Sequence, residues 1–277
     1  MTTQEFHRLA WDAAHVARFW DFASSSPAFA RDYFSRQVGV GLATFIRRLA
    51  PRASTVLDFG CGPGYLAEQL VRVGMRCGGC DSSPASVAAA NARLGGAGAW
   101  QGALAIGALP LPYADGAFDL VVACETLEHL LPGDIDGLLA EWRRILAPGR
   151  GRLLVTTPNG EDLALAEVGC PGCGAVFHRF QHLRSFDGDA LAALLEAHGF
   201  VTELCGATDF MRFQPPAGYG RGIAAVARRM RQALRALARG TCGLIDALPM
   251  CRKVPGGRWL RAQLGDGPHL FWLGTRS

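Results

Sequence analysis

Three glycines at alternate positions form the most informative motif of the chain. Gly60, Gly62 and Gly64 follow the apolar residues 55–59 and precede a segment with helical periodicity. Between a strand and a helix, glycines let the backbone turn tightly and approach a ligand without interference from Cβ atoms. The spacing G-x-G-x-G differs from the G-x-G-x-x-G of dinucleotide sites, and the sequence contains no G-x-x-x-x-G-K-[ST] phosphate loop. The motif therefore predicts a ligand site of another kind.

A second group of reactive side chains follows the apolar residues 118–124. Glu125, Glu128 and His129 have the spacing E-x-x-E-H. His129 is a candidate general base, because an unperturbed imidazole titrates near neutral pH and α/β proteins place their sites at the carboxyl ends of strands. In the alternative, His129 only begins a helix and forms local hydrogen bonds. We predict that Glu128 and His129 are catalytic.

Two cysteines and two histidines have the spacing of a metal site. Cys170, Cys173, His178 and His182 form the pattern C-x2-C-x4-H-x3-H, and the cysteines have the C-P-x-C-G form of a zinc knuckle. If residues 178–182 are helical, the two histidines lie one turn apart and both can face the metal. The pattern predicts a closed, structural Cys₂His₂ zinc site that stabilises a loop. In the alternatives, His182 points into the site of the E-x-x-E-H residues, or the cysteines are thiols of a polar loop.

The hydrophobic periodicity predicts an alternation of strands and helices around these motifs. Expected strands cover residues 55–59, 75–80, 118–124, 152–157, 200–204 and 268–274, and expected helices cover 65–73, 84–94, 135–146 and 188–198. This order predicts right-handed βαβ units and a parallel sheet with helices on both faces. Residues 5–50 are expected to be helical. Their aromatic face either forms a lid over a pocket or packs in the core, and it consists of Trp11, Phe19, Trp20, Phe22, Tyr33 and Phe34.

The glycine loop, residues 56–64, resembles motif I of the class I S-adenosylmethionine-dependent methyltransferases. The resemblance covers residues 54–200 and continues, in the family's order and spacing, through residues 80–84, 111–119, 126–130 and 146–149. It implies a Rossmann-like α/β fold with a mostly parallel seven-stranded sheet, in which residues 268–274 form the reversed last strand. It also implies S-adenosylmethionine as the cofactor. The residues that the resemblance assigns to cofactor binding are Asp58, Gly60, Cys61, Gly62, Gly64, Asp81 and Ser82.

Within this resemblance, Asp81 occupies the position of the acid that holds the two ribose hydroxyls. A carboxylate is a suitable acceptor for both hydroxyl protons. Many members of the family also place an acid near the adenine amino group, but residues 101–104 contain none. Adenine is therefore expected to bind through backbone groups and apolar contacts.

The E-x-x-E-H residues resemble those of the ubiquinone-pathway O-methyltransferases and the small-RNA 2′-O-methyltransferases. Both groups are linked with a divalent metal at these positions. The resemblance implies that Glu125, Glu128 and His129 could hold Mg²⁺ or Mn²⁺ against vicinal oxygens of the acceptor and lower the pKa of its hydroxyl. The motif also occurs in family members without metal. In that alternative, His129 acts as a general base and no metal is bound.

The chain is expected to form a single methyltransferase domain over residues 1–277. Its expected parts are a helical lid (1–50), a cofactor-binding half (51–159), a Cys/His insertion (160–187) and a C-terminal half (188–277) with a basic helical insertion (212–265). The sequence has no apolar run of about 18 residues that could span a membrane. It also lacks the basic segment followed by an apolar run that is typical of a signal peptide. Both observations predict a cytoplasmic protein. The nine cysteines are an odd number, which favours thiols or metal ligands over a disulfide framework.

The basic residues concentrate near the C-terminus. Residues 221–261 contain ten basic residues and one acid, so the net charge of this segment is about +9. Because the net charge of the whole chain is +4, the remainder carries about −5. The segment either favours an anionic partner or is a solvated arginine-rich face. Between Arg228 and Arg239 it has no aromatic residue on which single-stranded nucleic acid could stack, which disfavours a nucleic-acid partner.

The expected function is O-methylation of a small metabolite, a glycan or a lipid-linked acceptor with S-adenosylmethionine. The alternatives are an RNA-directed methyltransferase and a non-catalytic binder of S-adenosylmethionine or nucleic acid that uses the zinc module and the basic segment. An anionic acceptor would suit the basic segment in either case.

Overall fold

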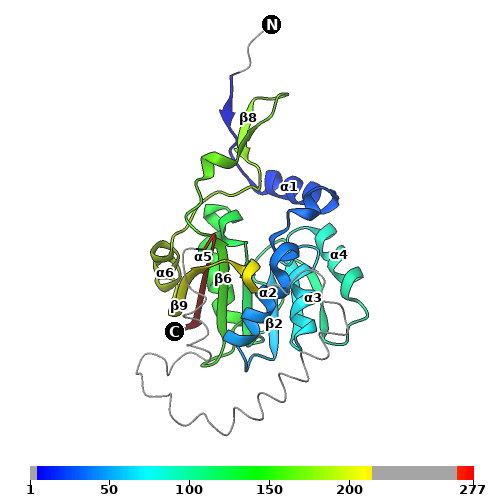
Figure 1. Cartoon of the computed structure of the whole chain (residues 1–277), viewed down its shortest axis with the longest axis vertical. Helices are drawn as coiled ribbons and strands as arrows, with labels where there is room; N and C mark the ends of the chain where they lie inside the picture. The colour runs from blue at the N-terminus through cyan, green and yellow to red at the C-terminus, as the bar shows by residue number, and fades with distance from the viewer. Residues whose placement is uncertain (1–4, 214–266) are drawn as a thin grey trace.

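The computed structural model of the chain describes residues 5–213 and 267–277, and a seven-stranded sheet lies at its centre (Figure 1). The strands are β2 (Thr55–Phe59), β3 (Arg76–Asp81), β4 (Trp100–Ala105), β5 (Leu120–Cys124), β6 (Arg152–Pro158), β9 (Phe200–Thr208) and β10 (His269–Arg276). They lie in the order β4-β3-β2-β5-β6-β10-β9. Strand β10 pairs antiparallel with both of its neighbours, whereas the other pairs are parallel. The predicted mostly parallel sheet with a reversed last strand is confirmed.

Helices cover both faces of this sheet because its inner strands are apolar on both sides. The helices are α1 (Ala13–Ser25), α2 (Phe34–Leu49), α3 (Tyr65–Arg72), α4 (Pro84–Leu94), α5 (Ile135–Ile145) and α6 (Gly188–Ala197). Adjacent residues of β2 divide between the two faces. Val56 belongs to the core that α2 and α3 cover, together with Phe45, and Leu57 belongs to the core that α5 and α6 cover, together with Trp142. This two-sided cover is what the alternation of strands and helices predicts.

The apolar pattern of the sequence does not predict strand β4. This strand lies at the edge of the sheet, and only Ala103 among its six residues is buried. Such an edge strand lacks the continuous apolar run that identifies the inner strands. Gly102, with a φ of +89°, adds an irregularity next to a shift in register against β3.

A second, three-stranded sheet projects from the main body (Figure 1). It contains β1 (His7–Arg8), β7 (Glu167–Gly169) and β8 (Ala175–His178) in the order β1-β8-β7. We call this sheet, with the adjoining 3-10 helix η4 (Leu163–Ala166), the arm. The N-terminal residues depart here from the predicted helical lid, because β1 pairs in parallel with β8 of the Cys/His insertion. The first helix of the lid starts only after Asp12, whose side chain caps it.

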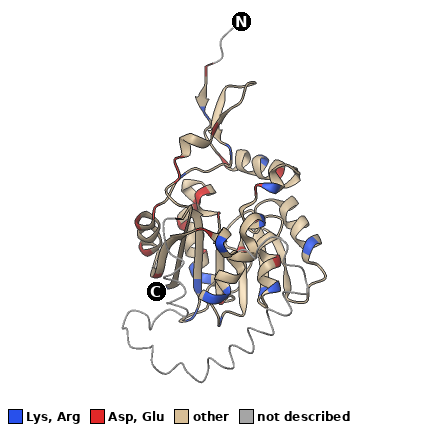
Figure 2. Ribbon diagram, viewed as in Figure 1, with Lys and Arg blue, Asp and Glu red and all other residues tan. Residues whose placement is uncertain are grey.

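The predicted basic helical insertion lies outside the described residues. In the view of Figure 2, acidic residues gather on α6 and along the arm, whereas basic residues lie mainly on α2, α3 and α4. Within residues 5–213 and 267–277, no helix combines the length and the apolar character needed to cross a membrane.

Candidate active site

A cavity of about 750 Å³ opens at the carboxyl ends of β2, β3, β5 and β6. Ligands of parallel α/β sheets bind at this end of the strands. The glycine loop and Asp81 border one part of the cavity, and Glu125 and His129 border another. Trp20 of α1 and Phe29 of the 3-10 helix η1 (Phe29–Arg31) also line it, so the N-terminal helices cover the cavity.

The glycine loop is shaped for close approach and is tied to Asp81. Gly60 and Gly62 have φ values of +73° and +50°, in the region that glycine adopts without strain. A Cβ atom at Gly60 would lie 2.7 Å from Thr126 Oγ1, so a larger residue does not fit there without a shift. The N–H of Gly62 donates to Asp81 Oδ2 (2.8 Å), and the N–H of Ser83 donates to Oδ1 (2.9 Å). These two bonds orient the Asp81 carboxylate at the cavity.

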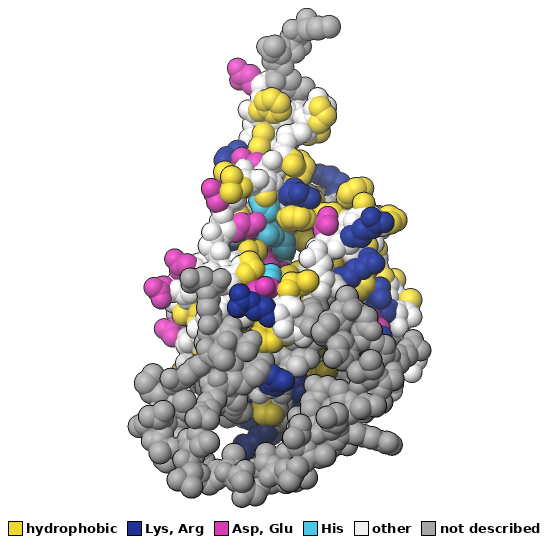
Figure 3. Space-filling model, viewed as in Figure 1, with side chains coloured by type: hydrophobic (Ala, Val, Ile, Leu, Met, Phe, Trp, Pro, Cys, Tyr) yellow, Lys and Arg dark blue, Asp and Glu magenta, His cyan; other side chains and the backbone are white. Residues whose placement is uncertain are grey.

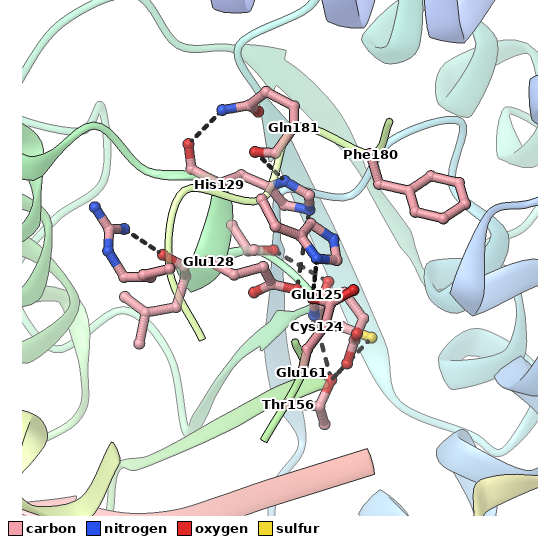
Figure 4. Close-up of polar contacts among 12 residues, drawn as sticks. Cys124, Glu125, Glu128, His129, Thr156, Glu161, Phe180 and Gln181 are labelled. Carbon is pink, nitrogen blue, oxygen red and sulfur yellow. Dashed lines mark hydrogen bonds and ion pairs between the residues drawn. The ribbon is translucent and has the colours of Figure 1, made fainter. Parts of the chain in front are cut away.

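Glu125 leaves strand β5 in a strained conformation, with a φ of +47°. This conformation is uncommon for a non-glycine residue and is often found at functional sites. The Glu125 N–H donates to the Thr156 carbonyl, and its carboxylate accepts a hydrogen bond from Thr156 Oγ1 at 2.9 Å (Figure 4). Burial raises the pKa of Glu125 to about 8 against the opposing effect of the Thr156 hydroxyl.

Glu128 and His129 lie next to each other in the 3-10 helix η2 (Leu127–His129) that follows. Glu128 is inaccessible to solvent, and within the described part of the chain neither of its carboxylate oxygens has a hydrogen-bond partner. Burial raises the pKa of Glu128 well above its usual range, and the Glu125 carboxylate adds to this effect. His129 Nε2 lies 3.9 Å from Glu128 Oε1. The structure thus places the Glu128 carboxyl group next to the imidazole of His129 and leaves the described carboxylate oxygens without a hydrogen bond.

The ring of His129 is held by Gln181 and by the lid. Its Nδ1 lies 3.3 Å from the Gln181 carbonyl oxygen, so Nδ1–H donates and Nε2 is the acceptor nitrogen (Figure 4). Trp20 packs edge-on against the ring, with centroids 4.9 Å apart. Burial lowers the pKa of His129 to about 3, and the nearby His182 lowers it further. His129 is therefore neutral at physiological pH, which differs from the near-neutral titration that the sequence predicts.

Two further imidazoles come from the Cys/His insertion. His182 Nδ1 lies 2.5 Å from Glu161 Oε2, and the ring of His182 stacks on that of His178 with centroids 4.3 Å apart. His178 Nδ1 accepts the backbone N–H groups of Phe180 and His182. Its Nε2 therefore carries the proton and lies 3.3 Å from Glu161 Oε1. Glu161 consequently lies against both rings and hydrogen-bonds to that of His182.

These side chains form two overlapping groups that could hold a metal ion. In the first group, one ligand atom each from Glu128, His129 and His182 lies within 4.8 Å of the others, and Glu161, His178 and His182 form the second group. Histidine side chains are visible at the molecular surface between the arm and the main body (Figure 3). The first group combines an unpaired carboxyl group with two imidazoles whose Nδ1 atoms are engaged, which leaves both Nε2 atoms as ligands.

The comparisons with known proteins agree with the fold. A family model described as a methyltransferase domain matches residues 34–204. The chain belongs to the class I S-adenosylmethionine-dependent methyltransferases. A protein of Mycolicibacterium smegmatis named "Probable S-adenosylmethionine-dependent methyltransferase" is 37% identical over 159 residues, which are 57% of this chain and 56% of that protein. A ubiquinone biosynthesis O-methyltransferase of Sinorhizobium medicae is 32% identical over 131 residues, 47% of each chain.

The chain spans about half the length of these curated relatives. Two solved structures share its fold over most of its length. The CcbJ methyltransferase of Streptomyces caelestis has a TM-score of 0.59 at 16% identity and covers 96% of this chain and 100% of its own. The 1,6-didemethyltoxoflavin-N1-methyltransferase of Burkholderia thailandensis, solved with S-adenosylhomocysteine, has a TM-score of 0.58 at 17% identity and covers 98% of this chain and 92% of its own. At these identities the likeness concerns the fold.

Most of the residues that the sequence assigns to cofactor binding border the cavity, namely Gly60, Cys61, Gly62, Asp81 and Ser82. Asp58 and Gly64 do not border it. Asp58 is buried, where it accepts the N–H of Ala67 in α3 and where burial raises its pKa to about 7. Gly64 has a φ of +80° and forms the N-cap of α3. Asp58 in β2 thus contacts the start of α3, and Gly64 begins that helix, so both residues shape the loop from outside the cavity.

The structure does not assemble the predicted Cys₂His₂ zinc site. Strand β8 separates Cys173 from His178, and four extended residues span about 13 Å. His178 therefore lies at the base of the β7–β8 hairpin, whereas Cys170 and Cys173 lie in the turn at its tip. In residues 5–213 and 267–277, neither cysteine belongs to a group of three side chains that could hold a metal. Residues 178–182 also do not form the helical turn that would place both histidines on one face, because they form a turn in which the histidine rings stack.

Two residues that organise the site are absent from the sequence-based predictions. Gln181, buried with a φ of +64°, accepts a hydrogen bond from Trp20 Nε1 (2.9 Å) and donates one to the His129 carbonyl (2.9 Å). It thereby joins the lid, the E-x-x-E-H residues and the insertion, and no local pattern signals this role. Glu161 lies a few residues after the carboxyl end of the predicted strand 152–157. Because α/β proteins place their sites at such strand ends, this position could have indicated a role in the site. His182 takes the position that the sequence left as an alternative, beside the E-x-x-E-H residues.

The depressed pKa of His129 predicts a specific pH dependence of stability. Its ordinary pKa is 6.5 and its folded pKa is about 3, so between these values the unfolded chain binds more protons. The free energy of unfolding should therefore decrease as the pH falls from 6.5 towards 3, by up to about 1.4 kcal/mol per pH unit from this group. His129→Gln should remove this contribution in urea unfolding with a chelator present.

A matched control is His198, whose contact with the Leu194 carbonyl raises its pKa. His198→Gln should remove a contribution of opposite sign, because the folded state binds more protons there. Identical pH dependence in the wild type and in His129→Gln would contradict the neutral, buried imidazole.

Proposed function

We propose that this chain is an S-adenosylmethionine-dependent O-methyltransferase whose acceptor hydroxyl binds over Glu128, His129 and His182. The observation that carries this proposal is the position of these side chains in and beside one cavity with the glycine loop and Asp81. A sulfonium methyl is already activated, so the protein mainly has to align an acceptor oxygen with it and remove the hydroxyl proton.

The cofactor half of the cavity suits S-adenosylmethionine. Asp81 faces the cavity with its carboxylate oriented by two N–H groups, and it would accept the two ribose hydroxyl protons. The glycine loop would let the methionine portion approach the backbone. Ile106, Gly107 and Leu111 line the neighbouring wall without an acid, so adenine would bind there through apolar contact and backbone groups.

The E-x-x-E-H group also fits a divalent cation. Glu128 has two oxygens without hydrogen-bond partners in the described chain, and His129 and His182 are anchored through Nδ1 by a carbonyl and a carboxylate. Such anchoring is the usual outer support of metal-ligating histidines. Two imidazoles and one carboxylate favour Mn²⁺ over Mg²⁺, which prefers oxygen ligands. When bound, the cation would lower the pKa of an acceptor hydroxyl.

The same geometry weakens the role of His129 as a general base by itself. An imidazole with a pKa of about 3 is available at every physiological pH but accepts a proton poorly. Glu128, with its pKa raised by burial, accepts a proton more readily. We therefore assign proton removal to Glu128 and positioning of the acceptor oxygen to His129 and His182.

The acceptor half of the cavity has aromatic walls. Trp20, Phe29, Tyr33 and Phe180 line it, and their rings meet edge to face. Aromatic walls suit the flat face of a phenol or the apolar face of a sugar. The proposed acceptor is a small metabolite, glycan or lipid-linked molecule with neighbouring hydroxyls.

A panel of acceptors tests this function. Purified protein would be incubated with S-adenosylmethionine and Mn²⁺ plus either a catechol, a glycolipid, an amine or generic RNA, and S-adenosylhomocysteine would be quantified by mass spectrometry. We expect turnover with a hydroxyl acceptor, a methyl ether in the product, and inhibition by chelator. Methylation confined to the amine, or to RNA, would overturn the assignment of O-methylation of a small acceptor.

A further inference from the structure

The turn at the tip of the β7–β8 hairpin has a defined backbone geometry that the proposed function does not use. The N–H of Gly174 donates to the Cys170 carbonyl (2.9 Å), and the N–H of Cys170 donates to the Ala175 carbonyl (2.8 Å). Gly174 has a φ of +76°, which the turn requires and which glycine tolerates. The turn therefore brings Cys170 and Cys173 together at the end of the arm.

The two cysteines have the sequence form of one half of a zinc knuckle. Residues 170–174 read C-P-x-C-G, in which a tight turn presents two thiols to one metal ion. Cys173 is exposed and Cys170 is partly exposed, and both are thiols. Thiolate ligands of this kind select zinc over harder cations such as Mg²⁺.

This turn supplies only two of the four ligands that a structural zinc ion takes. The histidines expected to complete the set are engaged at the other end of the hairpin, where Glu161 contacts both rings. In the ranges that the structure describes, no third metal-capable side chain lies beside the two cysteines. The missing ligands must therefore come from elsewhere.

The position of the turn favours a second copy of the chain as the source. The arm projects away from the main body, which places the turn at its tip where a second copy could reach it (Figure 1). The arm also exposes apolar side chains: Phe6 is 71% exposed, Leu165 86% and Val168 40%. Hydrophobic side chains are visible along it in Figure 3. An apolar surface beside an incomplete metal site is suited to an interface between identical chains.

We propose that Cys170 and Cys173 of two copies of this chain together bind one Zn²⁺ in a Cys₄ tetrahedron, which joins the chains at the tips of their arms. The two-fold symmetry of such a contact is satisfied, because each chain contributes the same two residues. Phe6, which packs beside Gly169 next to the turn, would then lie near the interface. This site is separate from the cavity and would set the oligomeric state, not the chemistry.

Zinc content and molar mass, measured on the same samples, test the proposal. The full chain would be analysed with a phosphine reductant by light scattering and elemental analysis, beside the variant Cys170→Ser/Cys173→Ser. We expect a wild-type dimer that a chelator dissociates and added Zn²⁺ restores, and a monomeric variant. The wild type should carry about half a zinc per chain more than the variant. Taking the difference cancels any zinc in the cavity.

Cys205→Ser on β9 is a matched control and should behave as the wild type. Unchanged S-adenosylhomocysteine affinity of the double variant would show that it is folded. Substitution with Co²⁺ should give the absorption of a tetrahedral all-thiolate site. A double variant that still dimerises, a wild type without extra zinc, or a monomer with one extra zinc per chain would each overturn the two-chain site.

Discussion

Asp81→Ala is expected to weaken S-adenosylhomocysteine binding by at least about 100-fold while the protein stays folded. Hydrogen bonds to a charged group contribute roughly 1.5–3 kcal/mol each, and the substitution would remove both of the proposed contacts with the ribose hydroxyls. It also removes the acceptor of the Gly62 and Ser83 N–H groups, so the glycine loop loses its anchor. Titration calorimetry of the purified variant measures the effect.

Asp115→Ala provides the control for this experiment. The Asp115 side chain is 82% exposed and pairs with Arg144 outside the cavity. Its variant should bind S-adenosylhomocysteine as the wild type does. Circular dichroism and a thermal melt would show whether each variant is folded. An Asp81→Ala variant that is folded and retains its affinity would disprove the role of Asp81 in holding the ribose.

Glu128→Gln is expected to lower kcat by about 10²- to 10⁴-fold and to leave S-adenosylhomocysteine affinity unchanged. The amide keeps the shape of the carboxyl group but can neither accept a proton nor carry charge. Because burial raises the pKa of Glu128 and disfavours its charged form, the neutral amide should cost little stability. Steady-state kinetics with the acceptor identified from the panel, together with calorimetry, separate the two effects.

Two comparisons sharpen this test. Glu68→Gln on α3 changes a carboxylate that does not border the cavity, and it should retain full turnover. His182→Ala should raise the Mn²⁺ concentration needed for half-maximal rate, whereas His198→Ala at the end of α6 should not. Normal turnover of a folded Glu128→Gln variant would remove Glu128 from the mechanism.

The part of the site proposed for the cofactor could be predicted from the sequence because its signals are local. The glycine spacing, the acid after the second strand and the order of strands and helices each depend on residues close in sequence. A strand that is buried on both faces needs a continuous apolar run, so β2, β5 and β6 are recognisable. The resemblance to a methyltransferase family rests on the same local patterns, and the sheet order agrees with it.

The acceptor half depended on contacts between distant segments. Trp20, His129 and Gln181 belong to three separate segments, and only their packing buries the imidazole and depresses its pKa. Likewise, C-x2-C-x4-H-x3-H states which ligands are near in sequence but not whether the chain between them is coiled or extended. Because β8 is extended, it separates the cysteines from the histidines and assigns them to opposite ends of one hairpin. Spacing limits which side chains can meet, whereas backbone conformation and burial decide which of them do and in which protonation state.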